Sequence, residues 1–491
     1  MSTQTAQTTL KQDPTKSLYI NGEWQSGTDT IANINPSNTS ENLGDFAQAS
    51  KDQVKDAIAA ARAAQPKWEA TPLEKKQSIL QAIGDEMIAR CDELGTLLSL
   101  EEGKPFAEGR GEIYRAGQFF HYYAAEVLRQ MGDLADSVRP GVKVEVTREA
   151  VGVVAIISPW NFPTATAVWK IAPALAFGNS VIWKPANLTP ASAVAMAEII
   201  HRQGLPEGTF NLVLGGGSSV GDALIHSTDI DAVSFTGSVP TGRKVAAATA
   251  PNFVRCQLEM GSKNALVIAD DADMQIAVDA AIAGAFGGSG QKCTASSRLI
   301  VMDSVHDAFV EAMVERMKTL KVGHALDDGI FMGPVVDDKQ LAANMDWVEK
   351  AKQAGANLAY GGERLQKQHD GYYMAPTLFT ETDNSWDVNQ EEVFAPLACV
   401  IRAKDLEEAI AMTNDTRFGL TGGIITQSLR NSALFKEQVQ AGCVMVNLAT
   451  AGTDYHVPFG GRKQSSFGPR EQGQYAKEFY TIVKTAYQKA Y

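Results

Sequence analysis

The sequence contains few cysteines, and their spacing suggests neither a disulfide framework nor a metal site. Five cysteines are scattered through 491 residues, without a CxxC motif or a Cys/His cluster. Small disulfide-stapled scaffolds and zinc modules need closer and more regular spacing. We therefore expect no metal and no disulfide scaffold. A chain of this length has ample material for a core and predicts about three domain-sized units.

Long apolar runs and an excess of positive charge are also missing. No apolar stretch is long enough to cross a bilayer, so we expect no membrane partner. Residues 1–17 are polar and rich in Thr and Gln, without the basic and apolar segments of a secretion signal. The 44 basic residues are outnumbered by 57 acidic ones, and nucleic-acid binding needs a basic face. These features predict a cytoplasmic protein with no nucleic-acid partner.

Strand and helix patterns alternate through the middle of the chain. The continuous apolar run at 151–157 is typical of a buried parallel strand. Further strand and helix patterns follow up to about residue 260, and the alternation begins again at 265–268. This order predicts an α/β fold with two doubly wound domains, one after the other.

Local signals outside this region predict a helix start and two exposed strands. Thr71 can cap a helix in which Pro72 fits the first turn and Glu74 closes the capping box. Residues 142–147 and 479–487 alternate apolar and polar side chains, as half-buried strands do. These two remote strands could pair into an arm, and an ordinary edge hairpin is the alternative.

Four short motifs occur in order along the chain. They read SPWNFP at 158–163, FTGS at 235–238, LEMG at 258–261 and GSGQKCT at 288–294. Taken singly they are ambiguous, because most lone cysteines are small hydrophobic residues and a plain turn explains the glycines at 237–242 equally well. Together they resemble the NAD(P)-dependent aldehyde dehydrogenase superfamily, and the resemblance covers nearly the whole chain.

The resemblance implies a domain arrangement and an assembly. The dinucleotide-binding domain would comprise 1–133 and 151–260, and the catalytic domain 261–460. Segments 134–150 and 461–491 would form a β-strand arm for oligomerisation. A homo-oligomer, either a dimer or a tetramer, is therefore expected.

The resemblance also implies three catalytic residues. Cys293 is the nucleophile, since a thiolate can add to an aldehyde carbonyl. The side-chain amide of Asn161 and the backbone N–H of Cys293 can stabilise the resulting oxyanion. Glu259 is the general base that activates water for hydrolysis of the thioester. A surface carboxylate at a helix end is the alternative for Glu259.

The adenosine half of the cofactor is expected near the end of the strand at 180–183. Strand ends at a sheet crevice are where α/β proteins bind ligands, and the resemblance makes Lys184 the contact of the ribose and of a 2′-phosphate. Asn187 stands where strictly NAD-dependent members typically carry glutamate. A neutral amide does not repel a 2′-phosphate, so NADP is expected to be accepted, alone or alongside NAD.

The remaining cofactor contacts come from the other motifs. A glycine-containing turn before a helix lets the backbone approach a phosphate. Glu392 and Phe394 match the pair that holds the nicotinamide ribose and ring. The resemblance assigns further cofactor contacts to Ser158, Trp160, Gly237 and Ser238.

Within the superfamily, the segments around Lys184, Cys293 and Phe459 look most like α-ketoglutaric semialdehyde dehydrogenases. A carboxylate-bearing substrate needs a cation in the tunnel, preferably arginine. Arg115 is the candidate, and a solvated helix arginine is the alternative. Gly287 and Gly288 stand where some semialdehyde-specific relatives place arginine, which argues against an acidic substrate. The expected tunnel lining is Phe162, Trp169, Tyr455 and Phe459.

Other activities remain open at this stage. The substrate could be succinic semialdehyde, or a neutral aliphatic or aromatic aldehyde. A CoA-acylating enzyme would not need Glu259, and a catalytically silent NAD(P)-binding protein would not need Cys293 or Asn161. A thiol hydrolase would need a histidine, and none lies in these motifs. The favoured hypothesis is a hydrolytic aldehyde dehydrogenase.

Overall fold

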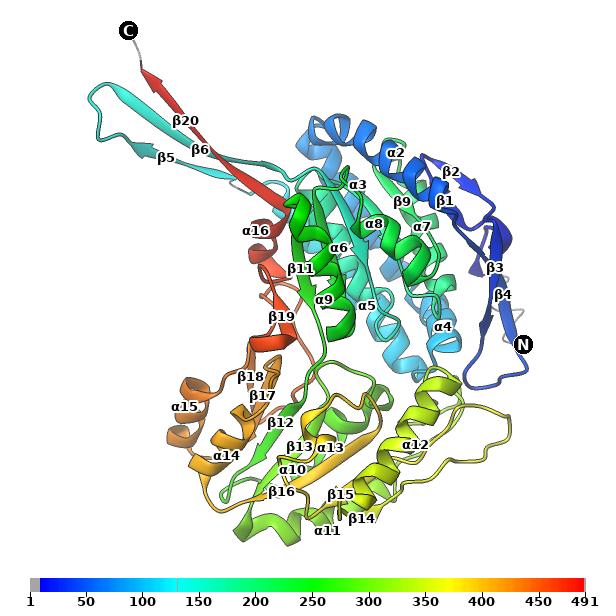
Figure 1. Cartoon of the computed structure of the whole chain (residues 1–491), viewed down its shortest axis with the longest axis vertical. Coiled ribbons are helices and arrows are strands. Elements are labelled where there is room, and N and C mark those ends of the chain that lie inside the picture. Colours follow the sequence, from blue (N-terminus) through cyan, green and yellow to red (C-terminus); the bar gives the residue numbers. More distant parts are fainter. Residues whose placement is uncertain (1–8, 130, 490–491) are drawn as a thin grey trace.

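The computed structural model describes residues 9–129 and 131–489, and it has a mixed α/β fold built on two large sheets (Figure 1). The predicted fold class, two doubly wound α/β units, is confirmed. The two sheets lie in different halves of the molecule, one above the other in Figure 1. Residues 1–8, 130 and 490–491, which the predicted domain boundaries include, lie outside the described part.

The first sheet has eight strands in the order β19-β11-β10-β7-β8-β9-β1-β2. Its central strands β11, β10, β7, β8 and β9 run parallel, while β1, β2 and β19 pair antiparallel. The bounds are β1 Leu18–Ile20, β2 Glu23–Gln25, β7 Val153–Ile157, β8 Ser180–Lys184, β9 Phe210–Leu212, β10 Ala232–Thr236, β11 Arg255–Glu259 and β19 Ser466–Phe467.

The second sheet has seven strands in the order β14-β15-β16-β13-β12-β17-β18, all parallel except β14. The bounds are β12 Asn264–Ile268, β13 Ser296–Met302, β14 Asn357–Tyr360, β15 Thr377–Thr380, β16 Leu397–Ala403, β17 Thr421–Ile425 and β18 Cys443–Val446. Only four residues separate β11, in the first sheet, from β12 in the second. Glu259 therefore lies where the chain passes between the two units.

Helices cover both sheets, and their apolar faces form the cores. Those beside the first sheet are α2 Lys51–Glu69, α3 Leu73–Ala89, α4 Cys91–Glu102, α5 Phe106–Glu126, α6 Ala165–Ala176, α7 Pro190–Arg202, α8 Asp222–Ile225, α9 Val239–Thr249 and α16 Lys477–Tyr480. Those beside the second sheet are α10 Met274–Phe286, α11 His306–Met317, α12 Asp338–Gln353, α13 Asp387–Gln390, α14 Leu406–Asn414 and α15 Leu429–Gln438.

The predicted cap of α3 is wrong. The helix begins at Leu73 with Pro72 before it, and no side chain caps its first amides. The Thr71 hydroxyl instead donates to the carbonyl oxygen of Lys67 at 2.9 Å. A threonine hydroxyl can bond to a carbonyl four residues earlier, and here that local bond wins over capping.

A three-stranded sheet projects from the body of the molecule (Figure 1). It consists of β5 Gly132–Asp136, β6 Val142–Ala150 and β20 Thr481–Lys489, with β6 in the middle. The expected pairing of the two remote segments is confirmed, since β20 pairs antiparallel with β6 along nine residues. A separate two-stranded sheet pairs β3 Asp29–Ile34 with β4 Asn42–Gln48. None of the helices described is long and apolar enough to span a membrane.

Candidate active site

Cys293 follows a turn that only a glycine-rich sequence can form. After α10, the turn Gly287–Gly290 has three consecutive residues with positive φ: Gly288 at 59°, Ser289 at 55° and Gly290 at 67°. A Cβ on Gly290 would lie 2.0 Å from the carbonyl oxygen of Ala395. The Ser289 hydroxyl donates to the carbonyl oxygen of Gly333 at 3.0 Å, which holds its strained backbone in place.

The Cys293 thiol lies close to two carboxylates. Burial raises its pKa well above the ordinary value, and the nearby Glu392 and Glu259 raise it further. The thiol is therefore protonated at neutral pH and must lose its proton when it attacks. The carbonyl oxygen of Cys293 accepts a hydrogen bond from the side-chain amide of Asn264 at 2.8 Å, which fixes the residue at the start of the second unit.

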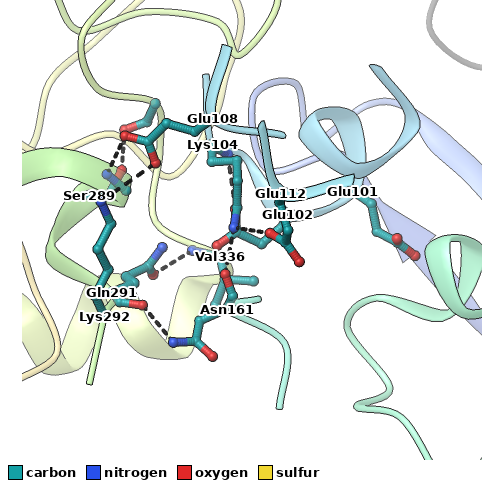
Figure 2. Close-up of polar contacts among 12 residues, drawn as sticks. Glu101, Glu102, Lys104, Glu108, Glu112, Asn161, Ser289, Gln291, Lys292 and Val336 are labelled. Carbon is teal, nitrogen blue, oxygen red and sulfur yellow. Dashed lines mark hydrogen bonds and ion pairs between the residues drawn. The ribbon is translucent and has the colours of Figure 1, made fainter. Parts of the chain in front are cut away.

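Asn161 lies in the turn between β7 and α6 and points at the cysteine loop. Its side-chain Nδ2 donates to the carbonyl oxygen of Gln291 at 2.9 Å (Figure 2). An amide nitrogen carries two hydrogens, so the second remains available to an acceptor. Asn161 and Cys293 line the same cavity.

Glu259 ends β11 and is buried, with 3% of its surface exposed. The Ser466 hydroxyl donates to its Oε2 at 2.5 Å. Burial raises the pKa of Glu259 well above its usual range, and the neighbouring Glu471 carboxylate adds to the shift. The charges of Lys170 and Arg470 act in the opposite direction. In its ionised form, a carboxylate with a raised pKa is a stronger base toward water than an ordinary carboxylate.

Two cavities meet at Cys293. One of about 360 Å³ is lined by Arg115, Phe162, Trp169, Lys292 and Phe459, among others. The other, of about 380 Å³, is lined by residues of the cofactor and catalytic motifs: Trp160, Asn161, Gly237, Ser238, Glu259, Glu392 and Phe394. Cys293 lines both. The structure thus brings twelve of the predicted site residues to two adjoining cavities.

Tyr455 lies behind the first cavity and does not line it. Its ring packs against Phe119 at a centroid distance of 6.2 Å, and the guanidinium of Arg115 lies 5.3 Å from the ring centroid. A guanidinium over an aromatic face is attracted by the ring electrons. Tyr455 therefore supports Arg115 from outside, and its contact with substrate stays a prediction.

Ser158, Lys184 and Asn187 gather at the carboxyl ends of β7 and β8, apart from the two cavities. Ser158 accepts a hydrogen bond from the indole of Trp183 at 2.8 Å. The Lys184 amine donates to the carbonyl oxygen of Pro185 at 2.9 Å, and the Asn187 amide donates to Gln48 at 3.2 Å. In the part of the chain that is described, no carboxylate forms an ion pair with Lys184.

These residues fit an anionic dinucleotide. Burial lowers the pKa of Lys184 to about 8, and an adjacent phosphate would raise it and favour the charged amine. The N-terminus of α9 has no side-chain cap, which leaves its first amides free for a phosphate. Among the residues that the structure describes, none forms a hydrogen bond with the buried hydroxyl of Thr236, beside the second cavity. No group of three His, Cys, Asp or Glu side chains within residues 9–129 and 131–489 is arranged to hold a metal.

Sequence reasoning missed Lys292 and Glu108, which line the first cavity. The Lys292 amine lies 3.8 Å from Glu108, whose carboxylate also accepts the amide of Gly288 at 3.0 Å (Figure 2). A Cβ on Gly288 would lie 2.6 Å from Cε of Lys292. The glycine therefore leaves the space that the lysine side chain occupies. The position of Lys292 directly before Cys293 was the available signal.

Comparison with known proteins places the whole chain among its relatives. The aldehyde dehydrogenase family model matches residues 24–486. The chain is 38% identical to the α-ketoglutaric semialdehyde dehydrogenase of Bacillus subtilis, over 96% of this chain and 97% of the relative. It is also 38% identical to the 2,5-dioxopentanoate dehydrogenase of Saccharolobus solfataricus, over 95% and 98%. The crystal structure of Staphylococcus aureus betaine aldehyde dehydrogenase with NAD+ superposes with a TM-score of 0.96, at 34% identity, covering 99% and 97%.

Proposed function

The chain belongs to the aldehyde dehydrogenase family, and we propose that its substrate is a small semialdehyde that bears a carboxylate, such as α-ketoglutaric semialdehyde. The product is the free acid, and NAD(P)+ is reduced. The observation that carries the substrate class is an arginine without a counter-ion in the cavity that reaches the nucleophile. Arg115 lines the cavity that reaches Cys293, and no carboxylate in the described ranges forms an ion pair with it.

The reaction begins with addition of the Cys293 sulfur to the aldehyde carbon, with loss of the thiol proton. The negative charge that develops on the carbonyl oxygen is stabilised by the Asn161 amide and the backbone N–H of Cys293. The carbon–hydrogen bond of the former aldehyde carbon then breaks, and the hydrogen leaves with both bonding electrons as hydride. The cavity lined by Glu392 and Phe394 would hold NAD(P)+, which would supply the acceptor for that hydride. Cys293 then carries a thioester of the acid.

Glu259 is the base for the second half of the reaction. It lines the same cavity as Cys293 and its raised pKa suits proton removal from a water molecule. That water attacks the thioester carbonyl, the carbon–sulfur bond breaks, and the free acid leaves Cys293 ready for another turnover. This base favours hydrolysis over transfer of the acyl group to a thiol cosubstrate.

The charges around the first cavity support an anionic substrate. Glu112 also borders it, but its carboxylate is already paired with Lys104 at 2.8 Å. The Lys292 amine lies 3.8 Å from the Glu108 carboxylate. This ion pair is loose enough for the lysine to turn toward the carboxylate of a substrate. The cavity therefore offers one unpaired cation and one loosely paired cation. Lys292 also supplies the positive charge that glycine at 287 and 288 cannot.

A neutral aldehyde is the second candidate, because the cavity walls are aromatic. Phe119, Phe162, Trp169 and Phe459 line it. The two candidates predict different effects of Arg115→Leu on kcat/KM. A hydrogen bond between charged groups contributes about 1.5–3 kcal/mol, so an acidic semialdehyde should lose about 10- to 150-fold. A neutral aldehyde of similar length should change little.

The matched control is Arg110→Leu, on the same helix. Arg110 is exposed and pairs with Asp92, away from the cavity. It should leave both substrates unaffected. Equal losses for acidic and neutral aldehydes in Arg115→Leu would reject the carboxylate anchor and leave the cysteine mechanism standing.

We further propose that the projecting sheet joins copies of the chain into a homo-oligomer, and that the protein is cytoplasmic. Exposed apolar side chains on the arm support the first proposal: Leu134 is 83% exposed and Tyr487 62%. All five cysteines are free thiols, which suits a reducing compartment. Replacing Leu134 and Tyr487 with Ser should lower the mass measured by light scattering. An unchanged mass would reject the arm as an interface.

A further inference from the structure

A buried lysine contacts the backbone of Asn161 and is not among the residues that line the two cavities. Lys104 belongs to the loop that joins α4 to α5, and only 3% of its surface is exposed. Its amine donates to the backbone carbonyl oxygen of Asn161 at 2.6 Å and to Glu112 Oε2 at 2.8 Å (Figure 2). The same amine lies 4.2 Å from the centroid of the Phe162 ring.

Glu112 holds the other end of the same segment. Its Oε1 accepts the backbone amides of Thr164 at 2.9 Å and of Ala165 at 3.0 Å. These are the amides of the N-cap residue and of the first residue of α6, whose N-cap side chain makes no capping hydrogen bond. A carboxylate at a helix N-terminus satisfies the free amides and is favoured by the helix dipole. Lys104 and Glu112 therefore bind the backbone of the segment 161–165 at its two ends, one at the first carbonyl oxygen and the other at the last two amides.

We propose that the Lys104–Glu112 pair positions Asn161 for stabilisation of the oxyanion. The inference rests on the proposed role of Asn161. The side chain of Asn161 has one fixed bond, to Gln291, whose own side chain accepts the amide of Val336 at 3.0 Å. The backbone of Asn161 is fixed from the opposite side by Lys104. Because the side chain and the backbone of Asn161 are both held, the second hydrogen of its side-chain amide keeps one direction.

A purely stabilising role explains this cluster less well. Burying an ion pair costs desolvation energy, and such pairs add little stability compared with apolar residues of the same size. A second carboxyl group, Glu102, lies 3.8 Å from the Lys104 amine and is buried as well. Precise placement of a catalytic donor is a benefit that apolar residues would not supply, since an error of about 1 Å can lower a rate about 100-fold.

The test is a double-mutant cycle with Asn161→Ala, read as the rate of the first burst of reduced cofactor. Lys104→Met should lower that rate about 10- to 100-fold in the wild-type background, with little change in KM. In the Asn161→Ala background it should change the rate less than about threefold, because the donor it positions is already missing. An equal loss in both backgrounds would overturn the proposal.

Two further variants keep the experiment decisive. Glu112→Gln retains an oxygen for the α6 amides but loses the charge paired with Lys104, so it should show the same background dependence even if Lys104→Met does not fold. Lys76→Met is the control, because Lys76 is also a buried lysine and donates to the carbonyl oxygen of Glu69 at 2.8 Å. It should leave the burst rate unchanged. If Asn161→Ala itself retains the wild-type rate, the proposed role of Asn161 fails, which is a separate result.

Discussion

Replacing Asn187 with glutamate should lower kcat/KM for NADP+ relative to kcat/KM for NAD+. The side chain lies just past β8, three residues after Lys184, and its amide donates to Gln48 at 3.2 Å. This strand end is where the adenosine ribose is expected. A carboxylate there would face the 2′-phosphate of NADP+, while it could accept hydrogen bonds from the ribose hydroxyls of NAD+.

The size of the effect follows from Coulomb's law. Two unit charges about 4 Å apart repel by about 4 kcal/mol at an effective dielectric constant of about 20. Asn187 is half-buried, so solvent and salt weaken this repulsion. About 1.5–3 kcal/mol should remain, which corresponds to a fall of about 10- to 150-fold in the ratio of kcat/KM for NADP+ to kcat/KM for NAD+.

The assay compares both cofactors with one aldehyde, at low and at high salt. The effect should shrink as ionic strength rises, because the repulsion is electrostatic. Asn187→Gln is the control, since it has the length of glutamate without the charge, and it should keep the wild-type ratio. If Asn187→Glu uses NADP+ as well as the wild type does, the side chain does not face the 2′-position and the reasoning is refuted.

Three other changes test the site and its support. Glu471→Gln removes a negative charge that raises the pKa of Glu259. The rate of thioester hydrolysis should therefore begin to increase at a lower pH than in the wild type. An unchanged pH profile would contradict this. Arg298→Met leaves four oxygen acceptors without this donor, three of them in buried hydrogen bonds, and should lower the free energy of unfolding in urea by about 3 kcal/mol. A loss under about 1 kcal/mol would argue against it. Gly290→Ala places a Cβ 2.0 Å from a backbone oxygen and should lower kcat at least about 100-fold. Gly329→Ala is the control, because Gly329 also has a positive φ but no atom lies within 4 Å of the new Cβ. This variant should keep its activity, which would show that the loss in Gly290→Ala comes from the steric clash and not from backbone strain alone.

The parallel strands could be predicted from the sequence, because strands buried on both faces appear as continuous apolar runs. Residues 151–157 predicted the buried strand β7, and every residue from Val153 to Ile156 is buried. The family predicted from the four motifs is confirmed by the match over residues 24–486. The catalytic and cofactor residues could be proposed because four motifs occur together and in order, as in the family that they resemble; taken singly, each motif was ambiguous.

Boundaries and long-range contacts were harder to predict. The strand expected at 479–487 is found at Thr481–Lys489, because the side chains of Phe479 and Tyr480 are buried in the short helix α16. The contact between Lys104 and Asn161 joins residues 57 positions apart. Nothing in the spacing of either residue indicates it, since it depends on how α5 packs beside α6.

The glycine-for-arginine difference at 287–288 shows how one local absence can mislead. It argued against an acidic substrate because some semialdehyde-specific relatives place arginine there. The structure shows the Lys292 side chain in the space that Gly288 leaves open. Side-chain direction after a turn with three positive φ angles could not be predicted from sequence order alone.

The central claim is that Cys293 carries an acyl group which Glu259 removes by activating water. The most direct measurement is the intact mass of Glu259→Gln after mixing with α-ketoglutaric semialdehyde and NADP+, together with the amount of reduced cofactor. The account predicts one acyl group per chain, attached at Cys293, and about one equivalent of reduced cofactor. Continuous turnover at the wild-type rate without an adduct, or an adduct that persists in a Cys293→Ala variant, would contradict it.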